Sequence, residues 1–222
     1  MNDLSVVIVT YRRDLSLFER CIQSIAKYGI VAHDINIVVV VNDDFALLND
    51  IVALTAPLSI NINVLHYSEL TDWTGHIGWD SQQYFKLAIA NFVKTTWYLV
   101  LDSDNCLWDH VPASAIFVDN RASYLWTQTT DHHKNYLHNA LLFWNSEPLD
   151  YSMGDSTPFV LHTATVRKLL QHTDPQWFNF DNQGALYTFE FFLYYAYLKY
   201  TNTLDILYFK KTTGPLIRGI QR

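Results

Sequence analysis

Two carboxylates stand one residue apart in the segment Asp102-Ser-Asp-Asn105, directly after the apolar run 97–101. That run has the composition of a buried strand, and carboxylates at its end are costly to place without a partner. A divalent cation is the simplest partner, because oxygen ligands of this kind suit Mg²⁺ or Mn²⁺, which keep water and bind substrate phosphates. Asp, Ser and Asn are also ordinary turn residues, so a solvated turn explains the same segment.

The composition excludes several classes of protein. The 222 residues are 50% hydrophobic and 15% aromatic, which is typical of a folded domain and not of a disordered chain. A formal net charge of -7 without a long basic run argues against sequence-independent nucleic-acid binding. The only cysteines, Cys21 and Cys106, exclude a disulfide framework and a thiol-rich zinc site, so we expect a reducing, cytoplasmic setting.

Hydropathy predicts neither a signal peptide nor a transmembrane segment. The N-terminus lacks a basic stretch and a small-residue cleavage site. The longest apolar stretches are well short of the roughly 18 residues that a membrane helix needs. The aromatic segment 189–200 is expected to be a buried helix, although peripheral contact with a membrane remains an alternative.

The first half of the chain alternates between two patterns. β-branched apolar runs predict strands over residues 4–10, 35–41, 60–65 and 97–101. Amphipathic stretches between them predict helices over 14–28, 45–54 and 79–93. This alternation predicts an α/β sandwich with a mostly parallel central sheet flanked by helices.

The second half has a weaker pattern. Strands are predicted over 122–128 and 140–144, on either side of the His-rich loop 131–135. A helix is expected from about Thr163, an aromatic loop over 174–188, a helix over 189–200 and a strand over 204–209. A basic tail follows, with Lys210, Lys211 and Arg218. No repeat or linker interrupts the chain, so one domain is expected.

Polar residues follow three of the predicted strands, at the ends where parallel sheets bind ligands. These ends are Thr10-Tyr-Arg12, Asn42-Asp-Asp44 and Asp102-Ser-Asp104. The run Val6–Arg12 together with the other two ends resembles the glycosyltransferases of the GT-A fold, which carry an Asp-X-Asp motif. The segments 78–87 and 98–105 are similar to uncharacterised bacterial glycosyltransferases assigned to polysaccharide biosynthesis. The resemblance covers mainly residues 4–110.

The resemblance implies a single GT-A-like, Rossmann-like domain over residues 1–222. Residues 1–105 would form the half that binds a nucleotide sugar, and 106–222 the acceptor half. Asp104 would ligate Mn²⁺ or Mg²⁺ at the donor diphosphate. Asp102 would contact the donor ribose or the metal. His162 is the preferred third metal ligand, and His132, His133 and His138 are less favoured candidates. Adjacent histidines on a loop, such as His132-His133, are more often solvated than part of a metal site.

The resemblance also implies a donor-binding set. Thr10 and Tyr11 would face the nucleoside and Arg12 the phosphates, with a UDP-sugar the expected donor. Asp43 would contact base or ribose, although Asp44 competes for this role and one of the two is expected to be a helix N-cap. The helix residues Gln82, Gln83 and Lys86 complete the set; Gln82 and Lys86 share a face, from which Lys86 would neutralise phosphate.

An inverting transferase needs a base that takes the proton from the acceptor hydroxyl. By resemblance this acid stands at the start of a late helix, where Glu190 lies, and Asp155 and Asp181 are rivals. We therefore expect a metal-dependent glycosyltransferase that uses a nucleotide sugar and a glycan or other hydroxyl acceptor, with inversion favoured. Two alternatives stay open: a non-catalytic module that binds sugar nucleotides or glycans, and a phosphatase of the haloacid dehalogenase kind. The phosphatase normally carries its Asp-X-Asp on the first strand, whereas here it follows the fourth.

Overall fold

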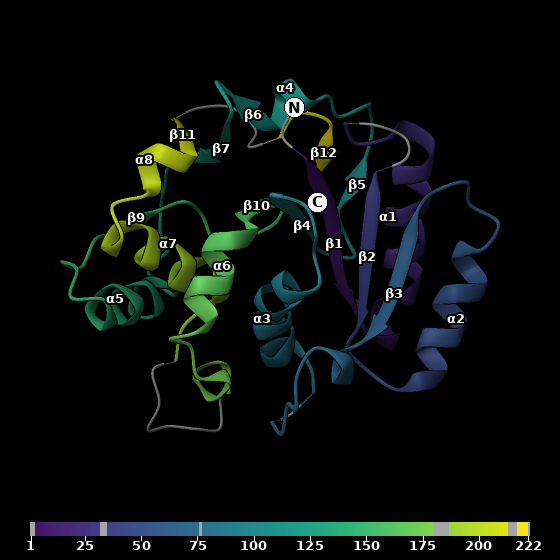
Figure 1. The fold of residues 1–222 in the computed structure, drawn as a ribbon, viewed down its shortest axis with the longest axis horizontal. Helices are drawn as coiled ribbons and strands as arrows, with labels where there is room; N and C mark the ends of the chain where they lie inside the picture. Colours follow the sequence, from purple (N-terminus) through teal and green to yellow (C-terminus); the bar gives the residue numbers. More distant parts are fainter. Residues whose placement is uncertain (1–2, 32–34, 76, 180–186, 213–216, 222) are drawn as a thin grey trace.

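A computed structural model describes residues 3–31, 35–75, 77–179, 187–212 and 217–221. Its central sheet has five strands in the order β10-β4-β1-β2-β3 (Figure 1). Strands β1 to β4 are parallel, and β10 pairs antiparallel with β4. The bounds are β1 Leu4–Thr10, β2 Asn36–Val41, β3 Ile62–His66, β4 Trp97–Leu101 and β10 Phe159–His162.

Burial explains the sequence of the inner strands. Every residue of β1 and β4 is buried, which is why both read as continuous apolar runs without a polar face. The helices of this half supply the covering surface; α1 buries Phe18, Cys21, Ile22 and Ile25, which recur at helical spacing. The helical segments are η1 Arg12–Asp14, α1 Leu15–Tyr28, α2 Phe45–Thr55, η2 Tyr67–Glu69, α3 Trp79–Ala88 and η3 Ile89–Asn91.

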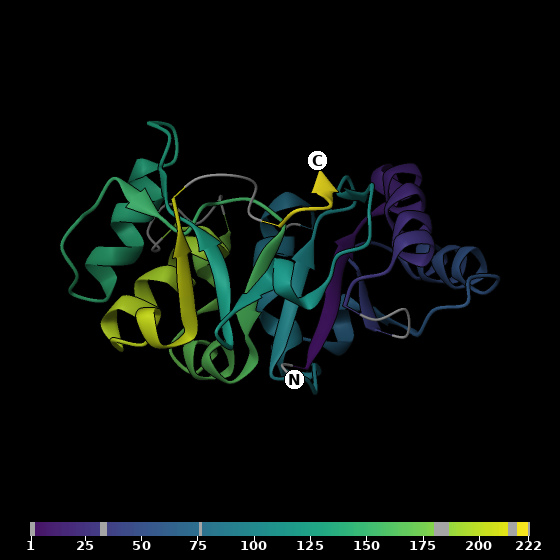
Figure 2. The same cartoon turned by 90° about the horizontal axis from the view of Figure 1, so that it is seen from above.

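The second half of the chain packs beside the β10 edge of this sheet. Figures 1 and 2 show α5, α7 and α8 at the opposite end of the molecule from α1 and α2. The small sheets of this half have the orders β11-β7-β6, β12-β5 and β8-β9, and β5 packs against α1 of the first half. The helical segments are α4 Ala113–Ile116, α5 Lys134–Phe143, α6 Thr163–Leu170, η4 Pro175–Phe178, α7 Glu190–Tyr200 and α8 Leu204–Leu207. The strands are β5 Cys106–Leu107, β6 Phe117–Val118, β7 Arg121–Leu125, β8 Thr127–Gln128, β9 Tyr151–Ser152, β11 Tyr208–Lys211 and β12 Ile220–Gln221.

Two sequence predictions for this half are wrong. The expected strand 140–144 is the end of helix α5, whose buried residues Leu137, Ala140 and Leu141 recur at helical spacing against α7. The expected strand 204–209 begins as the single helical turn α8, and β-structure starts only at Tyr208. The first error arises because a short apolar run does not distinguish a strand from a buried helix by periodicity, whereas the α8 turn buries none of its residues.

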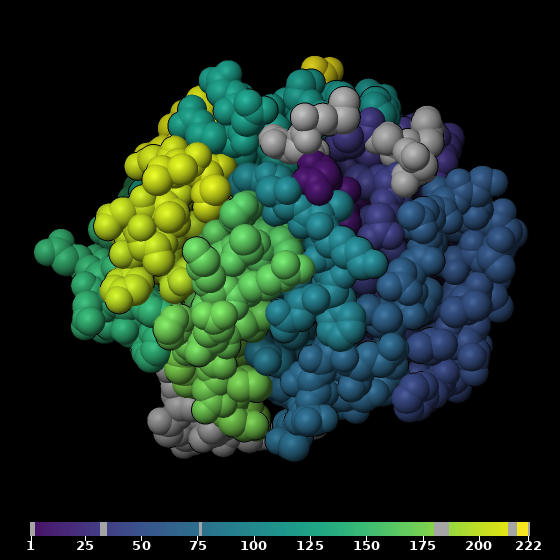
Figure 3. All heavy atoms as spheres, viewed as in Figure 1, coloured from purple at the N-terminus to yellow at the C-terminus, as the bar shows by residue number. Residues whose placement is uncertain are grey.

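The predicted fold class is confirmed: the molecule is a mixed α/β sandwich with a mostly parallel central sheet and flanking helices. One hydrophobic core extends through both halves, from Val6 and Leu99 in the sheet to Leu141 in α5 and Phe192 in α7. On the face in Figure 3 the surfaces of the two halves meet without a gap along α3 and α6. None of the helices in the described ranges is both long and apolar enough to span a bilayer.

Candidate active site

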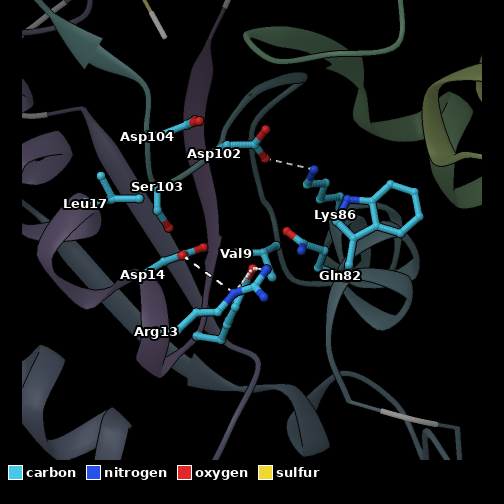
Figure 4. A pocket seen from close by; sticks show the side chains of 11 residues that line it. Val9, Arg13, Asp14, Leu17, Gln82, Lys86, Asp102, Ser103 and Asp104 are labelled. Atoms are coloured by element: carbon cyan, nitrogen blue, oxygen red, sulfur yellow. Dashed lines mark hydrogen bonds and ion pairs between the residues drawn. The ribbon is translucent and has the colours of Figure 1, made fainter.

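A pocket of about 250 Å³ opens at the carboxyl ends of β1 and β4. The two strands are parallel neighbours, with Ile8 opposite Leu101, so the segments that follow them meet at one edge of the sheet. Helix α3 supplies the opposite wall (Figure 4). The lining residues are Val9, Tyr11, Arg13, Asp14, Leu17, Trp79, Gln82, Lys86, Asp102, Ser103 and Asp104.

The turn that carries the two aspartates is fixed by Asn105. The Asn105 Oδ1 atom accepts the backbone N–H of Asp102 at 2.9 Å, and the Asn105 N–H donates to the Asp102 carbonyl at 3.0 Å. Asn105 is fully buried, and these two hydrogen bonds give it a role in shaping the turn. The Ser103 hydroxyl donates to the Thr10 hydroxyl at 2.9 Å, and both are buried. Thr10 therefore ties the end of β4 to the end of β1.

Lys86 joins Asp102 to a second buried carboxylate. Its ammonium lies 2.9 Å from Asp102 Oδ1 and 3.2 Å from Glu190 Oε1, and its side chain is 5% exposed. The Thr157 hydroxyl donates to the other oxygen of Asp102 at 2.7 Å. Burial disfavours the charged ammonium, but the two carboxylates outweigh it and raise the pKa of Lys86 above its usual value. Lys86 is therefore a cation at neutral pH.

Glu190 begins helix α7 and lies behind Lys86. Its side chain is 3% exposed, and the amide of Gln83, with its nitrogen turned toward the carboxylate, donates to Glu190 Oε1 at 3.1 Å. Burial raises the pKa of Glu190 to about 7, against the opposing effect of the Lys86 ammonium. Gln83 and Glu190 thus form an inner layer beneath Lys86, whereas Gln82 lines the pocket itself.

The cation of the η1 turn that lines the pocket is Arg13. Its guanidinium lies 4.5 Å from the centre of the Tyr11 ring and donates through Nε to the Tyr11 hydroxyl at 2.7 Å. The guanidinium of Arg12 instead contacts Asp44 at 3.1 Å and Asp50 at 3.0 Å on helix α2. Sequence reasoning chose Arg12 and missed Arg13. The sequence feature that could have pointed to Arg13 is its position between Tyr11 and Asp14.

The two aspartates after β2, Asp43 and Asp44, make different contacts. Asp44 caps helix α2 by accepting the N–H of Leu47 at 2.9 Å, so the prediction that one of the pair is an N-cap is confirmed. Asp43 accepts the backbone N–H of Arg12 at 3.1 Å and thereby joins the end of β2 to the segment after β1. Its carboxylate is partly exposed at the sheet edge where a donor nucleoside was expected.

The expected third metal ligand is misplaced. His162 pairs with Trp97 in the β10–β4 register, so it lies at the start of β4 and Asp104 beyond its end. The five residue-to-residue steps from Trp97 to Asp102 span roughly 16 Å at about 3.3 Å per step, which is far too long for a shared ion. The His162 ring instead contacts the Thr165 hydroxyl at 2.8 Å, and burial lowers its pKa. His162 is therefore not a ligand of the same metal as Asp104.

The remaining donor set fits a weakly chelated hard cation. Within the described ranges, no group of three or more His, Cys, Asp or Glu side chains could enclose a metal ion. Asp102 and Asp104 both line the pocket (Figure 4); the Asp102 oxygens also contact Lys86 and Thr157, which makes Asp104 the better placed ligand of the two. Mg²⁺, and by the same ligand preference Mn²⁺, is commonly held by one or two carboxylates, with water and substrate phosphates filling the other positions. The residues therefore fit such an ion.

The other predicted residues lie outside this pocket. Asp155 contacts His133, with 2.6 Å between Oδ2 and Nδ1. His138 and Lys134 both contact Asp150. His132 is exposed, Lys210 lies over the Trp126 ring, and Arg218 lines a separate hollow beside α4. Asp181 lies outside the described residues.

Comparisons with known proteins agree on the fold. The structure is similar to S. aureus TarS, with a TM-score of 0.51 and 14% identity over 89% of this chain and 34% of that one. This chain thus spans about a third of TarS. It is also similar to mouse xyloside xylosyltransferase 1, with a TM-score of 0.50 and 12% identity over 94% of this chain and 85% of that one. At these identities the likeness establishes a glycosyltransferase-like fold alone.

Sequence comparison gives the family. No curated protein matches the sequence. Residues 1–220, nearly the whole chain, match DUF6492, which is described as a family of unknown function. The chain therefore belongs to the DUF6492 family.

Proposed function

We propose that this protein is a metal-dependent glycosyltransferase that moves a sugar from a nucleotide-sugar donor to a hydroxyl acceptor. The observation that carries the proposal is the acidic turn Asp102–Asp104, which follows a buried parallel strand and lines a polar pocket. The glycosyltransferase-like fold supports it. A glycan acceptor, a UDP-sugar donor and a role in polysaccharide or glycoconjugate synthesis belong to the same proposal.

The proposal gives each pocket residue a task. Asp104 and Asp102 would hold Mn²⁺ or Mg²⁺, and this ion would supply positive charge to the departing nucleoside diphosphate. Arg13 lies at the pocket edge, with a side chain 74% exposed that can turn toward a phosphate. Tyr11 and the half-exposed Trp79 offer aromatic faces for a base or a sugar. Gln82 offers an amide to the sugar hydroxyls.

The chemistry requires control of charge around the leaving diphosphate. Lys86 stays protonated between Asp102 and Glu190, so it offsets the negative charge of these carboxylates in the pocket wall. Fixed charges in a site of low dielectric stabilise developing charge without reorganisation of the protein. Glu190 in turn holds Lys86 in place. The alternative of a binding module without turnover uses the same pocket and differs only in the absence of product.

The first prediction concerns the Asp104→Asn variant. Because the amide lacks the negative charge of the carboxylate, the variant should bind UDP with Mn²⁺ at least about tenfold more weakly than the wild type, which is about 1.4 kcal/mol. Isothermal titration with and without Mn²⁺ measures this change, and hydrolysis of a panel of nucleotide sugars measures turnover. Asp205→Asn, an exposed change on α8, is the matched control.

The outcomes separate the candidate functions. Metal-dependent UDP binding and release of nucleoside diphosphate from a nucleotide sugar support the transferase. Metal-dependent binding without release from any donor of the panel supports the module. Release of inorganic phosphate from sugar phosphates would support the phosphatase. Equal UDP affinity in Asp104→Asn and the wild type would contradict the metal assignment.

A further inference from the structure

A His–carboxylate pair lies in the second half of the chain, outside the pocket. His133 Nδ1 is 2.6 Å from Asp155 Oδ2, and the two side chains are 29% and 27% exposed. A carboxylate at Nδ1 holds the proton on that nitrogen and leaves Nε2 as a proton acceptor. A base positioned by a carboxylate in this way is the arrangement that activates hydroxyl groups in hydrolases and transferases. Both side chains remain accessible to a substrate.

The pair adjoins the pocket on its acceptor side. Asp155 stands two residues before Thr157, whose hydroxyl donates to Asp102. The His133 ring packs edge-on against Phe189, with 5.0 Å between the ring centres, and Phe189 packs in the same way against Trp79 at 5.2 Å. Trp79 lines the pocket. Phe189 therefore lies between the His133–Asp155 pair and the candidate donor site.

The carboxylate that sequence reasoning preferred as base is less suited to this step. The Glu190 side chain is 3% exposed, and its oxygens contact Lys86 and Gln83. Its burial leaves an acceptor hydroxyl no approach in this conformation. The His133 side chain is about ten times more exposed, and among the described residues its close carboxylate partner is Asp155. The geometry thus separates a buried acid that holds Lys86 from a surface base.

We propose that His133, oriented by Asp155, is the general base that deprotonates the acceptor, an inference that rests on the proposed transferase function. The acceptor O–H bond breaks, and its proton moves to His133 Nε2. The acceptor oxygen forms a bond to the anomeric carbon, the bond from that carbon to the diphosphate oxygen breaks, and the nucleoside diphosphate leaves with the electron pair. Asp155 stabilises the imidazolium. Such a direct displacement inverts the anomeric centre.

The His133→Asn variant tests this assignment. The Asn amide can donate to Asp155 as Nδ1–H does, but it cannot accept a proton. We expect UDP affinity with Mn²⁺ within twofold of the wild type, whereas hydrolysis of the nucleotide sugar, with water as acceptor, falls about 100-fold or more. His138→Asn is the matched control, because His138 is similarly exposed on the same helix and shares Asp150 with Lys134. It should hydrolyse the donor at the wild-type rate.

A second variant protects the test against a folding artefact. His133→Ala removes the ring and leaves room for a small base. Added imidazole should therefore raise the hydrolysis rate of this variant at least tenfold, and an equal concentration of chloride should leave the rate unchanged. Hydrolysis in His133→Asn within threefold of the wild type would overturn the base assignment while leaving the transferase intact. Full loss in Glu190→Gln with no loss in His133→Asn would overturn it in favour of Glu190. A wild type that neither binds UDP nor hydrolyses any donor overturns both proposals.

Discussion

Two charged clusters flank the candidate active site, and they differ mainly in burial. Lys86, Asp102 and Glu190 form a cluster in which Lys86 and Glu190 are almost wholly shielded from water. His133 and Asp155 form a pair in which each side chain is more than a quarter exposed. Both contain an acid and a basic group in direct contact. Burial makes each charge of the first cluster depend on its partners for stabilisation, and exposure leaves the second available for proton transfer.

The energetic consequences differ accordingly. Breaking a buried ion pair costs about 3–5 kcal/mol, because the remaining charge is left without its partner in a medium of low dielectric. A solvent-exposed pair contributes about 0–1 kcal/mol, since water replaces the lost interaction. The comparison therefore predicts that substitutions in the buried cluster change stability as well as activity, and that substitutions in the exposed pair change activity with little effect on stability.

The largest expected effect is that of Lys86→Met. The change removes the cation that Asp102 and Glu190 share and keeps a side chain of similar length. We expect the free energy of unfolding to fall by about 3 kcal/mol or more, the range for a broken buried pair. Urea denaturation followed by tryptophan fluorescence measures it.

A double variant refines this prediction. Lys86→Met combined with Glu190→Gln removes one of the two buried charges that Lys86 balanced, so it should recover part of the lost stability. Lys199→Met, a lysine at the end of α7 whose ammonium lies over the Tyr195 ring, is the control. A loss of less than 1 kcal/mol in Lys86→Met would show that water or rearrangement compensates and that the cluster is less isolated than its burial indicates.

The next prediction concerns pH and Glu190. Its pKa rises from 4.5 to about 7 in the folded protein because of burial. The folded state therefore binds more protons than the unfolded state between these values, and stability must fall as pH rises from about 5 to about 8. Lys86 remains charged throughout this window, since its pKa is raised above its ordinary value near 10.5.

Glu190→Gln should remove this pH dependence. Thermal unfolding at several pH values should show a decline for the wild type across the window and a flatter profile for the variant. The stabilising effect of the substitution should be largest at the alkaline end, where the wild-type carboxylate is charged. If the stability of the two proteins changed with pH in the same way, the pH dependence would come from a group other than Glu190.

The sequence predicted the strands and helices of the first half of the chain well for a physical reason. Strands buried on both faces, such as Leu4–Thr10 and Trp97–Leu101, contain only residues that favour this environment. Their order then determines which polar ends meet, and this predicted that the segments of Tyr11 and Asp102 lie close together, whereas Lys86 was expected there from the family resemblance. The second half depends on helices with apolar residues on several faces. In α7 nine of its eleven residues are buried, so periodicity carries little information there.

Side-chain direction in the site was less predictable than position. Arg12 and Arg13 are adjacent, yet only Arg13 lines the pocket. The Arg12 guanidinium is held away from it by Asp44 and Asp50, at the start of and within α2. His133 and Asp155 are separated by 22 residues, and no local pattern connects them. Such contacts arise from tertiary packing, which a single sequence does not display. The motif of spaced aspartates was visible because both members lie in one turn.

The smallest expected change in stability is that of Asp155→Asn. Because both partners of the pair are partly exposed, the free energy of unfolding should change by less than about 1 kcal/mol. Nucleotide-sugar hydrolysis should nevertheless fall at least tenfold, since the amide no longer holds the proton on Nδ1 or stabilises the imidazolium. UDP affinity should stay unchanged. Asp150→Asn, which alters the carboxylate beside His138, should leave all three quantities near the wild type. A loss of stability as large as that of Lys86→Met would assign Asp155 to the structure of the fold, and the functional contrast between the two clusters would then disappear.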